Sequence, residues 1–145
     1  MKPLDSSQIA RACADAMWAD DNASKHLGMS LDHIAPGECV VSMEVTPVMT
    51  NGHKTCHGGY IFTLADSAFA FACNTYNQRT VAQHASITFL APAFEGDRLT
   101  ATARETLRSG RSGVYDVEVL NQKGETVALF RGHSRTVKGA LLPEG

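Results

Sequence analysis

The stretch HGGYIFTLADSAFAFACN, residues 57–74, decides how the rest of the chain must fold. It is too long for a typical strand, rich in alanine, and apolar on nearly every side of a helical projection, which is typical of a buried central helix. The pattern predicts a helix over residues 60–74 that begins at His57-Gly58-Gly59. The other elements must surround this helix to bury it.

The segments before and after this helix predict the strands that cover it. Residues 38–45 alternate apolar and polar side chains, as in a half-buried strand, and residues 28–35 form a candidate partner strand. After the helix we expect four strands, over residues 81–90, 99–108, 114–121 and 126–137. Glycines between the last three favour tight hairpins, so these strands should form an antiparallel meander. The predicted class is α+β, with an antiparallel sheet wrapped around the helix.

An amphipathic helix is also expected near the start of the chain. Ser6 or Ser7 can cap it. Apolar side chains recur at helical spacing at Ile9, Ala12, Cys13, Ala16 and Met17. Residues 47–56 lack periodicity and contain the turn signal Asn51-Gly52, so they are expected to form a loop that feeds the central helix.

The length and charge of the chain exclude several classes of protein. Its 145 residues fit one domain spanning residues 1–145, and a net charge of −2 with dispersed cations gives no footprint for nucleic acid or an anionic membrane. No signal-like segment and no apolar run of roughly 18 residues is present, so we expect a cytoplasmic protein. The four cysteines (Cys13, Cys39, Cys56 and Cys73) are singly spaced, which favours reduced thiols.

The central helix carries one acidic residue in an unfavourable place. Asp66 is the only charged side chain among residues 58–74. Burial of an unpaired carboxylate is costly, and a mid-helix position excludes a role in capping the helix end. Asp66 is therefore a candidate catalytic carboxylate. The structural alternative is an aspartate that pairs with an arginine or accepts hydrogen bonds from Ser67 or Asn74.

The two glycines at the start of the helix suggest a second catalytic element. Gly58 and Gly59 leave backbone N–H groups uncovered at the positive end of a helix, which suits a developing oxyanion. A tight loop-to-helix turn is the simpler alternative for the glycines alone. Acyl hydrolysis needs both such a donor and a carboxylate that activates water or attacks directly. Seven residues separate Gly59 from Asp66, or ~10.5 Å along a helix, so we expect a site shared between two subunits.

Other polar residues near the glycines allow weaker interpretations. His53, Cys56 and His57 could suggest a metal cluster, and Cys56 with His57 could suggest a thiol nucleophile, but both lack the further partners that such sites need. No metal is predicted. His57 is expected to hold the loop or polarise a thioester carbonyl, and Asn51 to donate a hydrogen bond to the loop or a water.

The predicted hairpin over residues 108–112 is a candidate phosphate site. Arg108 and Arg111 with Ser109, Gly110 and Ser112 combine cationic groups with free backbone donors, which suits phosphate groups. A solvated turn is the common alternative.

Several strings together resemble a known family, over nearly the whole chain from about residue 7 to residue 137. They are Asn51-Gly52-His53, Cys56-His57-Gly58-Gly59, residues 64–70, Ala72-Cys73-Asn74, residues 113–117 and residues 127–132. On these strings the chain resembles the hotdog-fold thioesterases, and specifically the PaaI-type enzymes of phenylacetate catabolism. The resemblance implies dimers in which two sheets join side by side, usually paired into a tetramer.

The resemblance also implies roles for particular residues. Asp66 would act as general base or nucleophile, the amide of Gly59 or Gly58 would hold the oxyanion, and Asn51 would position the loop or a water. Coenzyme A, as part of the substrate and with no other cofactor, would place its phosphates near residues 108–112. Some relatives have a serine or threonine that orients the water where this chain has Ala82, which leaves Gln83 and Ser67 as candidates.

The activity implied is hydrolysis of phenylacetyl-CoA or a ring-hydroxylated relative to free acid and coenzyme A. Alternatives are a broader medium-chain or aryl acyl-CoA thioesterase, a hotdog dehydratase, and a non-enzymatic acyl-CoA-binding regulator. A dehydratase is expected to pair a catalytic histidine with its acid, and a regulator to carry a DNA-binding segment; no basic helix-turn-helix stretch is present in the sequence.

Overall fold

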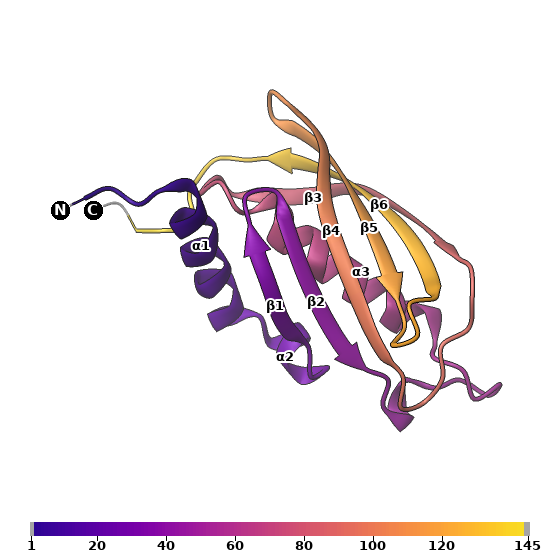
Figure 1. The fold of residues 1–145 in the computed structure, drawn as a ribbon. Coiled ribbons are helices and arrows are strands. Elements are labelled where there is room, and N and C mark those ends of the chain that lie inside the picture. The colour runs from indigo at the N-terminus through magenta and orange to yellow at the C-terminus, as the bar shows by residue number, and fades with distance from the viewer. Residues whose placement is uncertain (1, 144–145) are drawn as a thin grey trace.

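The computed structural model describes residues 2–143. Figure 1 shows the arrangement of the helices and strands. In chain order they are α1 (Ser6–Asp20), α2 (Asn22–His26), β1 (Ser30–Ala35), β2 (Glu38–Glu44), the 3-10 helix η1 (Pro47–Met49), α3 (Gly58–Cys73), β3 (Thr80–Phe89), β4 (Arg98–Ser109), β5 (Ser112–Leu120) and β6 (Thr126–Thr136).

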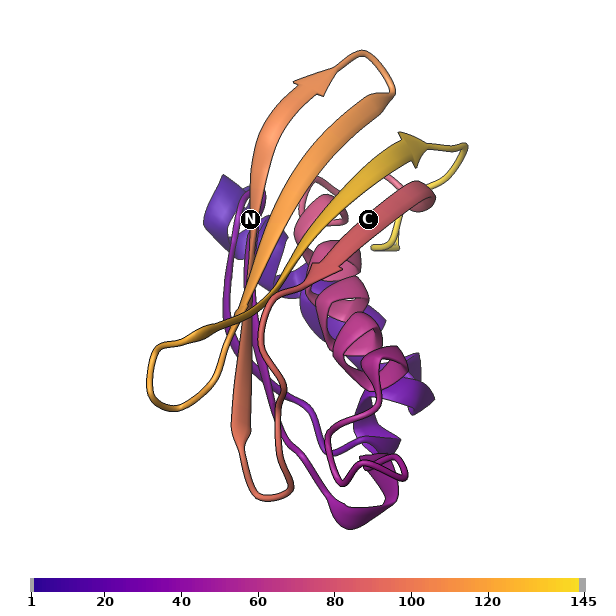
Figure 2. The same ribbon diagram turned by 90° about the vertical axis from the view of Figure 1, so that its right-hand side faces the viewer.

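The strands form one antiparallel sheet that curves around α3. The strand order is β1-β2-β4-β5-β6-β3, so β4, β5 and β6 are the predicted meander. In the register, Val117 of β5 lies between Ala103 of β4 and Phe130 of β6. Figure 2 shows the sheet arching over one side of α3. The predicted α+β class, a long helix wrapped by an antiparallel sheet, is confirmed.

The core lies between α3 and the concave face of the sheet. Leu64, Ala65 and Ala68 of α3 are fully buried. Phe69 packs between the rings of Tyr115 and Phe130, at centroid distances of 5.7 and 5.8 Å. A Cβ atom at Gly132 of β6 would lie 2.7 Å from the Phe69 ring, so only glycine allows the helix to approach the sheet this closely.

Two local predictions near the N-terminus need adjustment: the residue that caps α1, and the first residue of the strand that pairs with β2. Asp5, and not Ser6 or Ser7, caps α1: its carboxylate accepts from the amide of Gln8 at 2.8 Å, and the Gln8 side chain accepts from the Asp5 amide. A carboxylate followed by glutamine three residues later completes a reciprocal capping box that a serine one position later does not form. The strand predicted from residue 28 begins at Ser30 instead.

The buried side of α1 also differs from the prediction. Its buried residues are Ala10, Cys13 and Ala14, and the predicted Ala12 is only partly buried. All four cysteines are buried free thiols, and Cys39 and Cys73 lie in the core. Within the described residues, no helix has the length and apolar character needed to cross a bilayer.

The two edges of the sheet differ in how they are covered. At one edge, α1 lies beside β1 (Figure 1). At the other edge, β3 pairs only with β6 among residues 2–143, so its outer side has no partner strand in that part of the chain. Val81 and Phe89 of β3 keep 46% and 51% of their surface exposed. An exposed edge strand with apolar side chains is a template for pairing with another chain.

Candidate functional site

His57 forms the N-cap of α3. Its backbone is extended, and its Nδ1 accepts a hydrogen bond from the Gly59 amide at 2.9 Å. A neutral imidazole that accepts at Nδ1 carries its proton on Nε2, so the exposed His57 ring can donate through Nε2–H. The Gly59 amide, one of the two predicted oxyanion donors, is thus already bonded to the ring.

Gly58 provides the open donor at this helix end. Its amide donates to no atom of residues 2–143. A Cβ atom at Gly58 would lie 2.9 Å from Cζ of Phe89, so a larger residue would collide with the ring. Of the two glycines, Gly58 therefore has the free N–H group at the positive end of the helix.

The loop before α3 is held in place by Asn51. The Asn51 Oδ1 accepts from the His53 amide at 2.9 Å and from the amide and hydroxyl of Thr55 at 3.3 and 3.2 Å. The Asn51 side chain was expected to donate a hydrogen bond to the loop or to a water, but in its three hydrogen bonds with the loop its Oδ1 is the acceptor. The His57 amide donates to the Met49 carbonyl at 2.7 Å, which fixes the end of the loop against η1. The loop thus fixes the positions of His57 and the two glycines.

Asp66 is a partly buried carboxylate without a partner. Within residues 2–143 it forms no hydrogen bond and no ion pair with another side chain. Ser67 instead bonds Ser24, with 2.9 Å between their hydroxyl oxygens, and Asn74 donates to the carbonyls of Ala70 and Thr80. Burial raises the pKa of Asp66 above its ordinary value of 3.8. The structural alternative for Asp66 therefore has no support from its surroundings.

A cavity of about 490 Å³ opens beside the first turn of α3. Its walls are mostly apolar: Gly58 and Ile61 of α3 contribute one side, and residues 89–93 at the end of β3 the other. The open Gly58 amide and the Phe89 ring thus lie at the same cavity. Phe89 was not identified from the sequence, because its contact with Gly58 joins two segments that are 31 positions apart.

The thiol and metal alternatives gain nothing from the structure. Burial, reinforced by the charge of Asp97, raises the pKa of Cys56 to about 11, so the residue is a thiol rather than a nucleophilic thiolate at neutral pH. Across residues 2–143, no three His, Cys, Asp or Glu side chains come together as a possible metal site. The absence of a metal remains a prediction.

The predicted phosphate-binding residues lie far from the glycines of the same chain. Residues 108–112 form the exposed hairpin between β4 and β5, with Gly110 at φ +59°. Both ribbon views place this hairpin and the start of α3 at opposite ends of the molecule (Figures 1 and 2). Of the two candidates for water orientation, Ser67 is bonded to Ser24, and Gln83 lies at a bulge of β3.

Arg108 is held by residues that the sequence pattern did not single out. Its guanidinium lies 3.5 Å from the centroid of the Tyr76 ring, and Glu105 accepts from the hydroxyls of Tyr76 and Tyr115. These residues come from three separate segments. No local spacing could have revealed that they meet.

Comparisons with known proteins identify the family and the fold. Residues 53–128 match the family described as the Thioesterase superfamily. The chain is 47% identical over 131 residues to the acyl-coenzyme A thioesterase PaaI of Escherichia coli, covering 90% of this chain and 94% of that protein. The solved structure of the E. coli PaaI protein from the phenylacetic acid degradation operon superimposes with a TM-score of 0.92 at 46% identity, covering 94% and 99% of the two chains.

A more distant structure was solved with a ligand. A Streptococcus mutans protein bound to acetyl CoA matches with a TM-score of 0.74 at 27% identity, covering 77% of this chain and 90% of that chain.

Proposed function

Because this chain belongs to the thioesterase superfamily, we propose that it hydrolyses acyl-coenzyme A thioesters, with phenylacetyl-CoA or a ring-hydroxylated relative as substrate in phenylacetate catabolism. Its architecture is the hotdog fold. The observation that carries the proposal is the unpaired, partly buried carboxylate of Asp66 in the same helix whose first amide, that of Gly58, is an open donor.

The proposed reaction adds water across the thioester bond. Asp66 either removes a proton from water, which attacks the carbonyl carbon, or attacks that carbon itself to form an anhydride that water then hydrolyses. The carbonyl oxygen gains negative charge, which the Gly58 amide stabilises, and the Nε2–H group of His57 can add a second hydrogen bond. The C–S bond then breaks, and the sulfur leaves as coenzyme A after taking up a proton. Asn51 and Gly59 act indirectly, because they hold the loop and the His57 ring.

We propose that each site is shared between two subunits. Gly58 and Asp66 are eight positions, or ~12 Å, apart along one helix, too far for one carbonyl group to contact both. The unpaired edge of β3 can pair antiparallel with its copy across a two-fold axis. This pairing would bring the glycine end of one subunit beside the hairpin end of the other. Two such dimers would form the tetramer.

The apolar cavity and the hairpin fit the two parts of the substrate. The cavity beside Gly58 would take the aryl-acetyl group, with the Phe89 ring as one wall. Coenzyme A would extend toward residues 108–112 of the partner subunit, where Arg108 and Arg111 can bind its phosphates. No other cofactor, metal, nucleic acid or membrane partner is required. A single domain would suffice for this reaction. Its proposed location is the cytoplasm, together with the catabolic substrate.

The proposal is tested by release of free thiol from a panel of aryl- and alkyl-acyl-CoAs, with wild type compared with Asp66→Ala. We expect the highest kcat/KM for phenylacetyl-CoA and its hydroxylated relatives. Equal rates for medium-chain acyl-CoAs would indicate a broad-specificity enzyme instead. If the wild type binds these compounds but hydrolyses none, the chain is an acyl-CoA-binding protein.

A further inference from the structure

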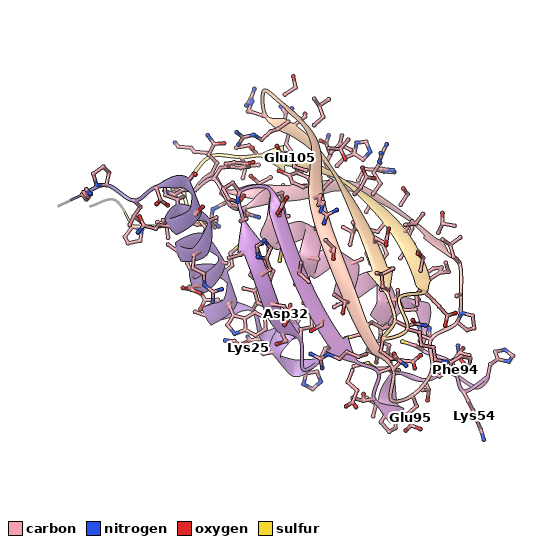
Figure 3. The ribbon with its side chains drawn as sticks, in the orientation of Figure 1. Lys25, Asp32, Lys54, Phe94, Glu95 and Glu105 are labelled. Atoms are coloured by element: carbon pink, nitrogen blue, oxygen red, sulfur yellow. The ribbon has the colours of Figure 1, made fainter. Side chains whose placement is uncertain are left out.

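Three side chains meet around one carboxylate at the hairpin end of the sheet. Glu105 of β4 accepts from the hydroxyl of Tyr76, which follows α3, and from the hydroxyl of Tyr115 on β5, each at 2.9 Å and each on Oε1. The Nε of Arg108 lies 3.9 Å from the same oxygen. Figure 3 labels Glu105 at this end, whereas Phe94 and Lys54 mark the opposite end near the start of α3.

The Arg108 guanidinium is oriented by two contacts of different kinds. It stacks over the Tyr76 ring, 3.5 Å from the centroid, which fixes the plane of the group. The proximity of Nε to Glu105 fixes its rotation within that plane. The two terminal nitrogens donate to no other atom of residues 2–143, and the side chain is 43% exposed. Arg108 therefore presents a free, oriented fork to solvent.

The cluster is anchored to the turn between β1 and β2. The Glu105 amide donates to the Gly37 carbonyl at 2.9 Å, and the Gly37 amide donates to the Thr75 hydroxyl at 2.8 Å. A Cβ atom at Gly37 would lie 2.9 Å from the Tyr76 hydroxyl oxygen, and the residue has φ +71°. Gly37 thus allows Tyr76 and Glu105 to pack against the turn, so both partners of Arg108 rest on the β1–β2 turn and not on the tip of the hairpin.

The two tyrosines keep their protons in this cluster. Burial, together with the neighbouring Glu105 carboxylate, raises the pKa of Tyr76 and of Tyr115, so both remain hydroxyl donors at neutral pH. Their hydrogen bonds occupy the Glu105 oxygen nearest to Arg108. An incoming anion would meet the open end of the guanidinium, with the carboxylate turned toward the tyrosines.

From this geometry we propose that Tyr76 and Glu105 are positioning residues that aim Arg108 at a phosphate of coenzyme A. The inference rests on the proposed function, since it assigns how the phosphates of that substrate are bound. A planar fork held in advance loses less conformational freedom on binding a phosphate than a free arginine does. Arg111 of the same hairpin is exposed and forms no side-chain contact of this kind among the described residues, so Arg108 is the specific anchor.

The test compares two substrates with the same acyl group, phenylacetyl-CoA and phenylacetyl-pantetheine, which lacks the nucleotide and all phosphates. Arg108→Met and Tyr76→Leu should each raise KM for the CoA ester about tenfold, the scale of one charge-assisted hydrogen bond, with kcat unchanged. KM for the pantetheine ester should not change. Tyr76→Phe keeps the aromatic face and should restore KM close to wild type. Glu105→Gln should raise KM for the CoA ester by less than Tyr76→Leu.

Arg11→Met is the matched control, because Arg11 is an exposed arginine paired with Asp15 on α1, away from the hairpin. It should leave both KM values unchanged. An equal rise in KM for both esters in Tyr76→Leu, or no rise in Arg108→Met, would overturn the inference while leaving the thioesterase activity intact. If the wild type hydrolyses neither ester, the proposed function fails. Calorimetric titration with coenzyme A then decides the inference, because the Kd of Arg108→Met and of Tyr76→Leu should each be about tenfold higher than that of wild type.

Discussion

The Nδ1 of His57 accepts the amide proton of Gly59 at 2.9 Å, so one ring both caps α3 and occupies one of its two glycine donors. This bond has two consequences for the site. It leaves Gly58 as the open backbone donor, and it places the ring proton on Nε2, where it can reach a substrate. The capping and catalytic contributions of His57 can be separated by substitution.

His57→Asn should keep the cap and remove the ring. Asparagine is a good N-cap residue, so the free energy of unfolding should stay near that of wild type, whereas His57→Ala should lose about 1 kcal/mol. Both variants should lose about tenfold in kcat, because both lack the Nε2–H donor. Thermal unfolding followed by circular dichroism, together with thiol release, measures the two effects. Full kcat in His57→Asn would show that the ring acts only as a cap.

Asp66→Asn should lose at least ~100-fold in kcat, the scale of a missing general base, while keeping fold and oligomeric state. At neutral pH its free energy of unfolding should also exceed that of wild type by about 0.5–2 kcal/mol, because the amide removes an unpaired, partly buried charge. The pKa of Asp66 is raised in the folded chain, so its charge destabilises the fold above that pKa. The stability gap should narrow as the pH falls through that pKa and should be closed below 3.8, the ordinary value. Asp20→Asn, at the end of α1, is the control for a simple charge change. A fully active Asp66→Asn would contradict the assigned role.

The acid side of the pH profile should reflect Asp66. The carboxylate must be ionised to act as base or nucleophile, and burial raises its pKa. Activity should therefore fall with decreasing pH around a midpoint above 3.8, the ordinary value for aspartate. The measurement is kcat/KM in a series of buffers of different pH, combined with circular dichroism to show that the protein stays folded. A midpoint at or below the ordinary value would mean that another group limits the rate.

Gly58→Ala should lose about 100-fold in kcat, the scale for one oxyanion donor. The added methyl would lie 2.9 Å from the Phe89 ring, and we expect the first turn of α3 to shift and to move the open amide with it. Gly52→Ala is the matched control, because a Cβ atom there meets nothing within 4 Å. Comparable activities of the two alanine variants would show that the Phe89 ring, and not the first turn of α3, moves to accept the methyl group.

A shared site predicts that two inactive variants complement each other. If Asp66 of one subunit works with Gly58 of its partner, a mixed dimer of Asp66→Asn and Gly58→Ala contains one intact site and one doubly altered site. Equal mixing after reversible dissociation should then recover about a quarter of wild-type activity. A site contained within one subunit would recover none, which makes thiol release after mixing decisive.

The features that could be predicted from the sequence are those encoded by periodicity. The helix over residues 58–73 and the meander of β4, β5 and β6 follow from apolar patterns and glycine turns, and they were found within a few residues of their expected ends. Asp66 could be singled out because a charge in an apolar helix is visible in one dimension.

The features that could not be predicted depend on contacts between distant segments or on local competition. Whether Gly58 or Gly59 offers the free amide depends on the rotamer of the His57 ring, which no sequence pattern encodes. Phe89 meets Gly58, and Tyr76 meets Glu105, only because the sheet wraps α3. At the N-terminus, Asp5 and not Ser6 caps α1, because the Gln8 side chain accepts a hydrogen bond from the Asp5 amide in return.

The unpaired edge of β3 has a consequence for how the protein must be handled. If subunits pair through β3 as proposed, a subunit that has lost its partner exposes a row of backbone donors and acceptors flanked by Val81 and Phe89. Any extended chain can add to such a row, so dilution should both lower specific activity and feed aggregation, as mass action shifts subunits out of their pairs. Storage at high concentration would then protect this protein, in contrast to the usual rule that concentrated solutions precipitate first.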